Sequence, residues 1–338
     1  MLNSILETIN DFMYTYLLLF LLIGTGLYFT IRTRFVQVRM IKEALHVLKE
    51  KGKEENGKKQ VSSFQALMIS TASRVGTGNI AGIATAIAAG GAGAVFWMWL
   101  MAVIGGASAF IESTLAQVYK VKDGADFRGG PAYYMERGLG KRWLGIIFSI
   151  LMIICFAYGF NGLQSFNMSS ALEYYIPGYS KSVYPAIVGL ILALATAFVI
   201  FGGVHRISFI TSVMVPIMAG IYLLIGLVTI CLNLPALPGV IASILSQAFD
   251  VKAIMGGMAG SAVVIGIKRG LFSNEAGMGS APNAAAAAFV SHPAKQGMVQ
   301  VLSVFIDTLL ICSATAMMLL LSGIEGAPGA LDGIPFVQ

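Results

Sequence analysis

The sequence predicts an all-α, polytopic membrane protein, and three observations lead to that prediction. The residues are 57% hydrophobic and only 11% charged, at a mean hydropathy of +0.80, whereas soluble domains carry about 25% charged residues. Eight apolar segments are each long enough to cross a bilayer, which takes about 20 residues. Glycines and polar residues interrupt two of these segments, a pattern that an uninterrupted lipid-facing helix would not have.

The eight predicted spans follow one another without a second domain, so residues 1–338 form one transmembrane unit. They cover 13–32, 64–90, 94–119, 143–167, 183–203, 208–232, 254–290 and 297–323. Lysines and arginines concentrate in 33–61 and recur in the loops after the third and fifth spans, and basic loops mark the cytoplasmic side. We therefore place 33–61 in the cytoplasm and the N-terminus outside. Residues 237–249 are mildly amphipathic and predict a short helix on the outer surface.

The net charge of +6 follows from these loops, so we expect no nucleic-acid partner. We also expect no cleavable signal peptide, because Glu7 and Asp11 occupy the N-terminal segment, which is basic in a signal peptide. Cys155, Cys231 and Cys312 lie in apolar spans without CxxC spacing, which predicts buried free thiols.

The second span is the first of the two interrupted segments. Gly76 and Gly78 flank Thr77, and Asn79 follows. Backbone that leaves the helix at membrane depth is tolerated where it lines a cavity or is buried in protein. These residues therefore predict a broken helix that holds a small polar solute. In the alternative interpretation, Gly78 and Gly82 form a GxxxG pair that packs one helix against another.

The seventh span, 254–290, is overlong and carries a similar interruption at 272–279. Because it lies five spans after the second, the two cross the membrane in opposite directions. Two five-helix units beginning at these spans would be inverted repeats, as in the leucine-transporter-like fold. We expect 13–32 to be an extra leading span, 64–232 to be the first repeat and 254–338 to begin the second. The rest of the second repeat is expected beyond residue 338.

Four stretches resemble the alanine or glycine:cation symporter family: 90–105 with its Phe-Trp-Met-Trp core, 75–80, 129–134 and 269–277. The resemblance covers nearly the whole chain. It implies a symporter of the plasma membrane that imports small neutral amino acids, alanine and glycine first, coupled to Na+. Alternating access around a site near the midplane is the mechanism of such transporters.

The same resemblance assigns roles in the second span. The amides of Thr77 and Gly78 would bind the substrate carboxylate, assisted by the positive end of the half-helix that begins there. The amide oxygen of Asn79 would ligate sodium. The carbonyl of Arg74 would face both the substrate ammonium and that sodium ion.

In the seventh span, the resemblance places Phe272 and Ser273 carbonyls at the substrate ammonium and lets the Ser273 hydroxyl join the sodium. Gly270 and Asn274 belong to the same motif and are expected at the substrate. In the fourth span, Phe160 and Gln164 share a helix face because they are four residues apart. We expect Gln164 to reach the substrate and Phe160 to form a wall. The alternative is a polar patch at the helix end.

Ionisable residues inside spans are functional candidates, although many form structural pairs. Asp307 could ligate sodium beside Asn79, or neutralise Arg74 or Arg269, and the sequence leaves these options open. We expect Glu112 to pair with a basic residue or to cap a neighbouring helix. Lys268 and Arg269 are expected to pair with acidic residues such as Glu275, Asp307 or Glu112.

Other functional classes fit the sequence less well. No GxxxxGK[ST] motif for ATP is present, and the three histidines, His46, His205 and His292, lie in loops or at helix ends. We therefore expect neither an ATP-driven pump nor an enzyme. A passive channel and a proton-coupled small-solute transporter are the alternatives to sodium symport.

Overall fold

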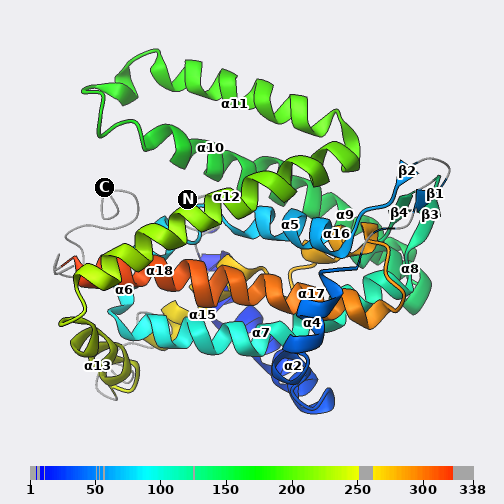
Figure 1. The fold of residues 1–338 in the computed structure, drawn as a ribbon, viewed down its shortest axis with the longest axis horizontal. Helices are drawn as coiled ribbons and strands as arrows, with labels where there is room; N and C mark the ends of the chain where they lie inside the picture. Colours follow the sequence, from blue (N-terminus) through cyan, green and yellow to red (C-terminus); the bar gives the residue numbers. More distant parts are fainter. Residues whose placement is uncertain are drawn as a thin grey trace.

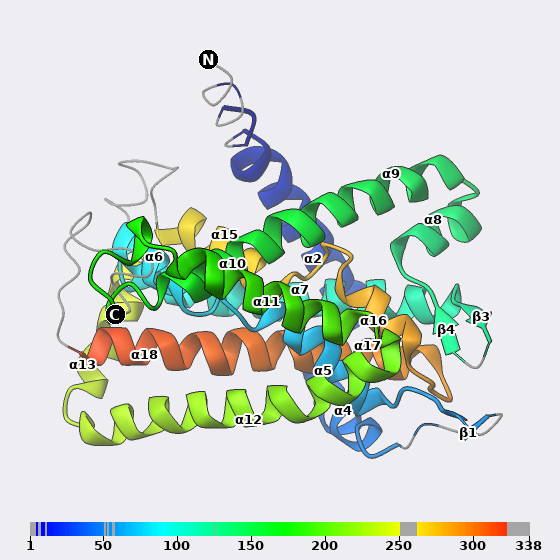
Figure 2. The same ribbon diagram turned by 90° about the horizontal axis from the view of Figure 1, so that it is seen from above.

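The computed structural model describes residues 5, 8–10, 12–50, 52, 54–55, 58–124, 126–250 and 262–322. Helices make up most of this part of the chain (Figure 1). The leading span is a π-helical segment, Met13–Leu18, that continues into α2 (Leu19–Arg32). In Figure 2 its N-terminal end points away from the bundle. The predicted span 13–32 therefore matches one continuous helix.

Within the described residues, four helices are long and apolar enough to cross a membrane. They are α7 (Gly93–Val118), α9 to α10 (Arg142–Ser170), α12 (Gly203–Leu232) and α17 to α18 (Pro293–Leu321). Two of these four helices contain a π-helical segment. The segment Ile154–Phe160 joins α9 (Arg142–Ile153) to α10 (Asn161–Ser170). The segment Ile306–Cys312 joins α17 (Pro293–Phe305) to α18 (Ser313–Leu321). α11 (Tyr184–Ile200) is apolar and slightly shorter. The fold is that of a multi-pass helical membrane protein.

The core lies where α7 packs against α17. The most apolar windows of α7 and of Pro293–Leu321 are 56% and 61% buried, compared with 6% for Arg142–Ser170 and 11% for Gly203–Leu232. Small residues permit the close approach, since a Cβ on Gly297 would lie 2.7 Å from the carbonyl oxygen of Phe110. α12 runs beside α18 in both views (Figures 1 and 2). Its large apolar side chains remain exposed, as suits a surface facing hydrocarbon.

Both predicted interruptions are present in the structure. The second span consists of α5 (Ser63–Arg74) and α6 (Ala81–Gly90), with Val75 in an extended conformation at the end of α5. The described part of the seventh consists of α15 (Ala262–Asn274) and α16 (Ala281–Ala287). Glu275, Gly277 and Gly279 all have positive φ angles, which few residues other than glycine adopt. We call 75–80 and 275–280 the paired breaks. The inverted-repeat relation between the two halves stays a prediction.

The predicted cytoplasmic loops gather at one end of the bundle, on the right in Figure 1. Lys295 pairs with Glu50, and His205 Nε2 lies 3.0 Å from Asp126 Oδ1. Val61 and Ala288 form a parallel β-bridge. The short elements at this end are β1 (Glu54–Glu55), β2 (Lys58–Lys59), β3 (Val121–Asp123), β4 (Asp126–Arg128) and α8 (Pro131–Leu139). Two further short helices, α3 (Val36–Arg39) and α4 (Ile41–Val47), pack along α17. The loops therefore share one side, as the charge pattern predicted.

One lysine at this end is partly desolvated. Lys120 Nζ donates to the carbonyl of Ala288 over 2.8 Å and lies 3.9 Å above the ring of Phe127. Burial lowers the pKa of Lys120 to about 8, because it disfavours the charged amine.

At the opposite end, α13 (Leu237–Ala248) matches the predicted short helix at 237–249. It packs on α7, where Trp97 Nε1 donates to the carbonyl of Ala248 over 2.9 Å.

Candidate functional site

The paired breaks lie against each other in the interior. A Cβ on Gly78 would lie 3.3 Å from Phe272 Cδ1 and 3.7 Å from the Cα of Ser273. The space between the two segments therefore has little room for a side chain at position 78, because even a Cβ there would press against Phe272. The breaks of the second and seventh spans therefore lie side by side, and a shared binding site there stays a prediction.

A buried polar cluster joins the two broken helices to the π-helical segment Ile306–Cys312. Asn79 Nδ2 donates to Asp307 Oδ1 over 2.7 Å and to Ser273 Oγ over 3.2 Å. The hydroxyls of Ser273 and Thr308 donate to Asp307 Oδ2 over 2.8 and 2.9 Å. We call Asn79, Ser273, Asp307, Thr308 and Cys312 the Asp307 cluster. The exposed fraction of each of these side chains is 1% or less, so solvent does not screen the carboxylate.

Cys312 belongs to this cluster, although the sequence analysis predicted only a buried free thiol at this position. Its Sγ lies 3.1 Å from Asn79 Nδ2 and 3.1 Å from Ser273 Oγ. An α-helix would turn residues five apart to different faces, whereas the i→i+5 hydrogen bonds of a π-helix bring them together. Asp307 and Cys312 are five residues apart and lie in such a segment. No sequence signal predicted this widened turn.

The Asn79 amide has its nitrogen toward the carboxylate. Its oxygen accepts the N–H of Gly76 over 2.8 Å, which closes the turn at the break. Ligation of sodium through this oxygen therefore requires the amide to turn over, or the ion to share the oxygen with Gly76. The oxygens of Asp307 and Ser273 already converge on the position that the Asn79 nitrogen occupies.

Gln164 reaches the break from α10. Its Oε1 accepts the N–H of Thr77 over 3.1 Å, so the amide expected to bind a substrate carboxylate is held by a side-chain oxygen in this structure. The ring of Phe160, one turn earlier, stacks on Phe272 with centroids 5.3 Å apart and on Phe156 at 4.8 Å. The fourth span thus supplies both a polar group and an aromatic wall, from the two positions that the sequence singled out.

Two residues expected at the substrate, Gly270 and Asn274, lie close to α7. A Cβ on Gly270 would lie 3.2 Å from the Cβ of Met101 and 3.3 Å from the Cα of Met98. Asn274 Oδ1 accepts the N–H of Ala276 over 3.0 Å, which stabilises the turn after α15. Packing and turn formation account for both residues, and contact with substrate stays a prediction for them.

Glu112 caps the second break, one of the two roles that the sequence offered for it. Its two carboxylate oxygens accept the N–H groups of Gly277 and Gly279, each over 3.2 Å. Negative charge is favourable at this position, just before α16 begins. Glu275 forms a second link that the sequence did not predict, because Oε2 accepts hydrogen bonds from Ser73 and Ser280. The Ser73 contact ties α5 to the second break directly.

Arg74 is the cation that lies among these acids. Its side chain is 3% exposed, and none of its three guanidinium nitrogens has a hydrogen-bond partner in the described part of the chain. It interacts electrostatically with Glu275, Asp307 and Glu112. We expected Lys268 to pair with one of these acids, but Lys268 forms no ion pair with a described residue. Together with Arg269, whose predicted pairing stays a prediction, it lines a separate pocket.

A cavity of about 300 Å3 borders Gly76 and Asn79 on the side of α12. Met218, Tyr222 and Ile311 form part of its almost wholly apolar wall. Such a surface offers few groups to the two charges of a zwitterion, since unpaired burial of charge is costly. The polar side of the breaks, where Gln164, Ser273 and Asp307 lie, is therefore the candidate site.

Comparison with known proteins shows the family of the chain. The sequence profile described as the sodium:alanine symporter family matches residues 1–338. The chain belongs to this family. It is 53% identical to the amino-acid carrier protein AlsT of Bacillus subtilis over 336 residues, which are 99% of the chain and 70% of AlsT. The chain is therefore a transporter and not an enzyme, as the sequence predicted.

Two further relatives cover similar shares. GlnT of Bacillus subtilis, named a probable sodium/glutamine symporter, is 49% identical over 337 residues, 100% of the chain and 69% of GlnT. The sodium/alanine symporter AgcS of Methanococcus maripaludis is 39% identical over 330 residues, 97% of the chain and 73% of AgcS. The family and these names support sodium-coupled symport of an amino acid in a multi-pass membrane protein.

Proposed function

We propose that the chain imports small neutral amino acids, alanine and glycine first, together with Na+, by alternating access around the paired breaks. The observation that carries this proposal is the Asp307 cluster. It connects both broken helices through a buried carboxylate, Asp307, which accepts a hydrogen bond from Asn79 of one break and one from Ser273 beside the other. A cation or substrate bound there would contact both helices at once, and so would couple their movements.

The Thr77 amide supports the proposed carboxylate site. This N–H donates to a carbonyl oxygen of Gln164, which occupies the place that a carboxylate oxygen of the substrate would take. α6 begins at Ala81, so the positive end of its dipole points toward the break. Gln164 would then release Thr77 and donate to the substrate through its own amide nitrogen. Gly78 would supply a second N–H, and the carbonyls of Phe272 and Ser273 would accept from the ammonium.

The balance of buried charge supports a bound cation. Arg74 interacts with three acids, Glu112, Glu275 and Asp307, so the acids outnumber their basic neighbour. Excess negative charge is unfavourable at membrane depth. A sodium ion held by Asp307, Ser273 and a turned Asn79 amide would offset part of it with oxygen ligands. Arg74 would complete the site through its carbonyl, while its guanidinium balances charge from the cytoplasmic side of the break.

The proposed function also implies an arrangement of the helices in two repeats. We assign 64–232 to a first five-helix repeat and 254–338 to the start of an inverted second repeat within one transmembrane unit, 1–338, with 13–32 as an additional helix. The loops that share one end of the bundle would face the cytoplasm, with the N-terminus outside and the protein in the plasma membrane. The helices of one bundle would rock against the remaining helices, and they would bend at the paired breaks.

Uptake of radiolabelled alanine by full-length protein in liposomes tests the function. We expect concentrative uptake with an inward sodium gradient, and competition by glycine. Uptake driven equally by an inward proton gradient without sodium would contradict sodium coupling. A passive channel would equilibrate alanine without accumulating it, and would show no counterflow when the liposomes are preloaded with unlabelled alanine.

A further inference from the structure

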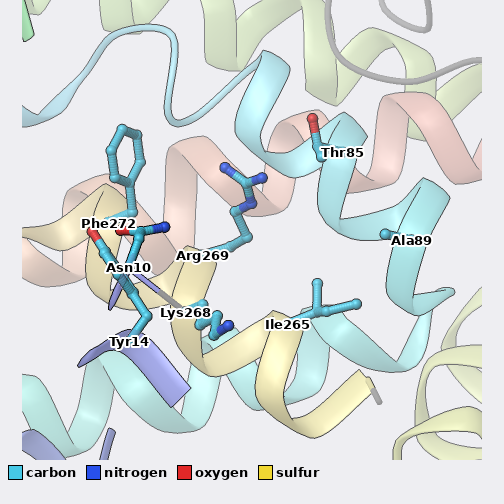
Figure 3. Close-up of a pocket in the computed structure, with 8 residues that line it drawn as sticks. All are labelled: Asn10, Tyr14, Thr85, Ala89, Ile265, Lys268, Arg269 and Phe272. Carbon is cyan, nitrogen blue, oxygen red and sulfur yellow. The ribbon is translucent and has the colours of Figure 1, made fainter. Parts of the chain in front are cut away.

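A pocket of about 380 Å3 lies between the leading helix, α6 and α15 (Figure 3). Its polar lining consists of Asn10, Tyr14, Thr85, Lys268 and Arg269, and Phe272 forms its inner wall. We call it the Lys268 pocket. It is large enough for a small ligand, since ligand pockets in proteins measure about 300 to 1,000 Å3. It is separate from the apolar cavity beside α12.

The described residues that line the Lys268 pocket carry positive charge. Two consecutive cationic residues of α15, Lys268 and Arg269, lie in its wall, and no aspartate or glutamate is among the described residues that line it. In Figure 3 the guanidinium of Arg269 extends into the space between Phe272 and Thr85. Lys268 makes neither a hydrogen bond nor an ion pair with any described residue. Half-buried cations in an apolar span favour a nearby anion.

The pocket is next to the paired breaks. Phe272 lines it and also stacks on Phe160, and a Cβ on Gly78 would lie 3.3 Å from its ring. One aromatic side chain thus separates the pocket from the candidate substrate site. A ligand in the Lys268 pocket would lie on the α6 and α15 side of that ring, which the charge pattern of the loops places toward the outside.

We propose that the Lys268 pocket binds a small anion, either the carboxylate of an incoming amino acid or a halide, before or during substrate entry. Lys268 supplies a point charge, Arg269 a planar donor, and Asn10 and Tyr14 neutral donors. The transport role of this site depends on the function proposed above, whereas anion binding itself does not. The two aspects are therefore tested by separate measurements.

Anion binding is measured on the purified protein by thermal unfolding in N-methylglucamine salts of formate, chloride and gluconate at equal ionic strength. Formate or chloride should raise the Tm of the wild type relative to gluconate, because a ligand that binds the native state stabilises it. Lys268→Gln should lose that increase, and Lys268→Arg should keep it. Lys181→Gln, an exposed lysine on the same predicted side, is the matched control. No increase in the wild type, or an equal increase in Lys268→Gln, would overturn the proposal.

Uptake identifies the occupant and the role of the site. For Lys268→Gln we expect the KM for alanine to rise about fivefold with little change in kcat, the size expected for one lost charge contact. If the occupant is the substrate carboxylate, chloride raises the KM of the wild type by competition. If it is a halide, replacing chloride with gluconate slows the wild type. Should the wild type show anion stabilisation but no alanine uptake, the anion site stands and the proposed function fails.

Discussion

At the scale of single residues, Gln164 connects the fourth span to the break in the second. It holds the Thr77 N–H, the group we assign to the substrate carboxylate. We predict that Gln164→Ala raises the KM for alanine about tenfold, because the substrate loses a buried hydrogen bond worth about 1 kcal/mol or more. Uptake kinetics in liposomes measure this. Asn161→Ala, one turn earlier and exposed, should behave as wild type. A lower KM in Gln164→Ala would mean that the side chain only competes with substrate.

The close approach of the paired breaks limits the size of the side chain at position 78. A Cβ there already meets Phe272 at 3.3 Å, so the branched side chain of Gly78→Val would force the breaks apart. We predict that this variant folds but transports at least about tenfold more slowly. Gly220→Val is the control, because a Cβ on Gly220 meets no atom within 4 Å. Equal rates for the two variants would show that the breaks need not approach each other.

At the scale of elements, Glu112 on α7 fixes the break between α15 and α16. Its carboxylate accepts two backbone N–H groups, that of Gly279, which is buried, and that of Gly277, which belongs to an exposed residue. Hydrogen bonds to a charged group contribute about 1.5 to 3 kcal/mol each. We therefore predict that Glu112→Ala lowers the free energy of unfolding by about 3 kcal/mol, and that Glu112→Gln loses less because one acceptor remains.

Thermal unfolding in detergent measures both Glu112 variants. Glu173→Ala, which removes an exposed carboxylate in the turn after α10, controls for the change in charge. If Glu112→Ala and Glu112→Gln unfold at the same temperature as the wild type, the carboxylate does not anchor the break.

The breaks were predictable from sequence, while the contacts across them were not. Glycines in an apolar span are a local signal, and so Gly76, Gly78 and Gly277 indicated where the helices end. The partners of Glu275 and Arg74 depend on how three helices pack, which no spacing within one helix reveals. The π-helical segment that brings Cys312 beside Asp307 is likewise a product of packing. For the same reason the sequence did not predict that Gly270 packs against α7 or that Asn274 holds the turn after α15.

At the scale of the whole molecule, the basic loops at one end give the protein a sidedness. We predict that His46→Cys reacts with a membrane-impermeant maleimide only from the cytoplasmic side, and Lys181→Cys only from outside. Both positions are exposed. The protein used for labelling should lack all three native cysteines. Cys312 is buried as predicted, whereas Cys155 and Cys231 are exposed, so the prediction of buried thiols was wrong for these two. Labelling of intact cells is compared with labelling of inverted vesicles. The reverse result, with His46→Cys labelled from outside and Lys181→Cys from the cytoplasmic side, would contradict the assigned topology.

The central claim is that sodium and alanine bind together where the paired breaks meet the Asp307 cluster. Its most direct test is the affinity of the purified protein for radiolabelled alanine at rising sodium concentration, in the wild type and in Asp307→Asn. The account predicts that sodium tightens alanine binding at least about fivefold in the wild type, within the usual range of coupling between two ligand sites. In Asp307→Asn alanine affinity should no longer depend on sodium. Equal sodium dependence in both proteins would contradict the account.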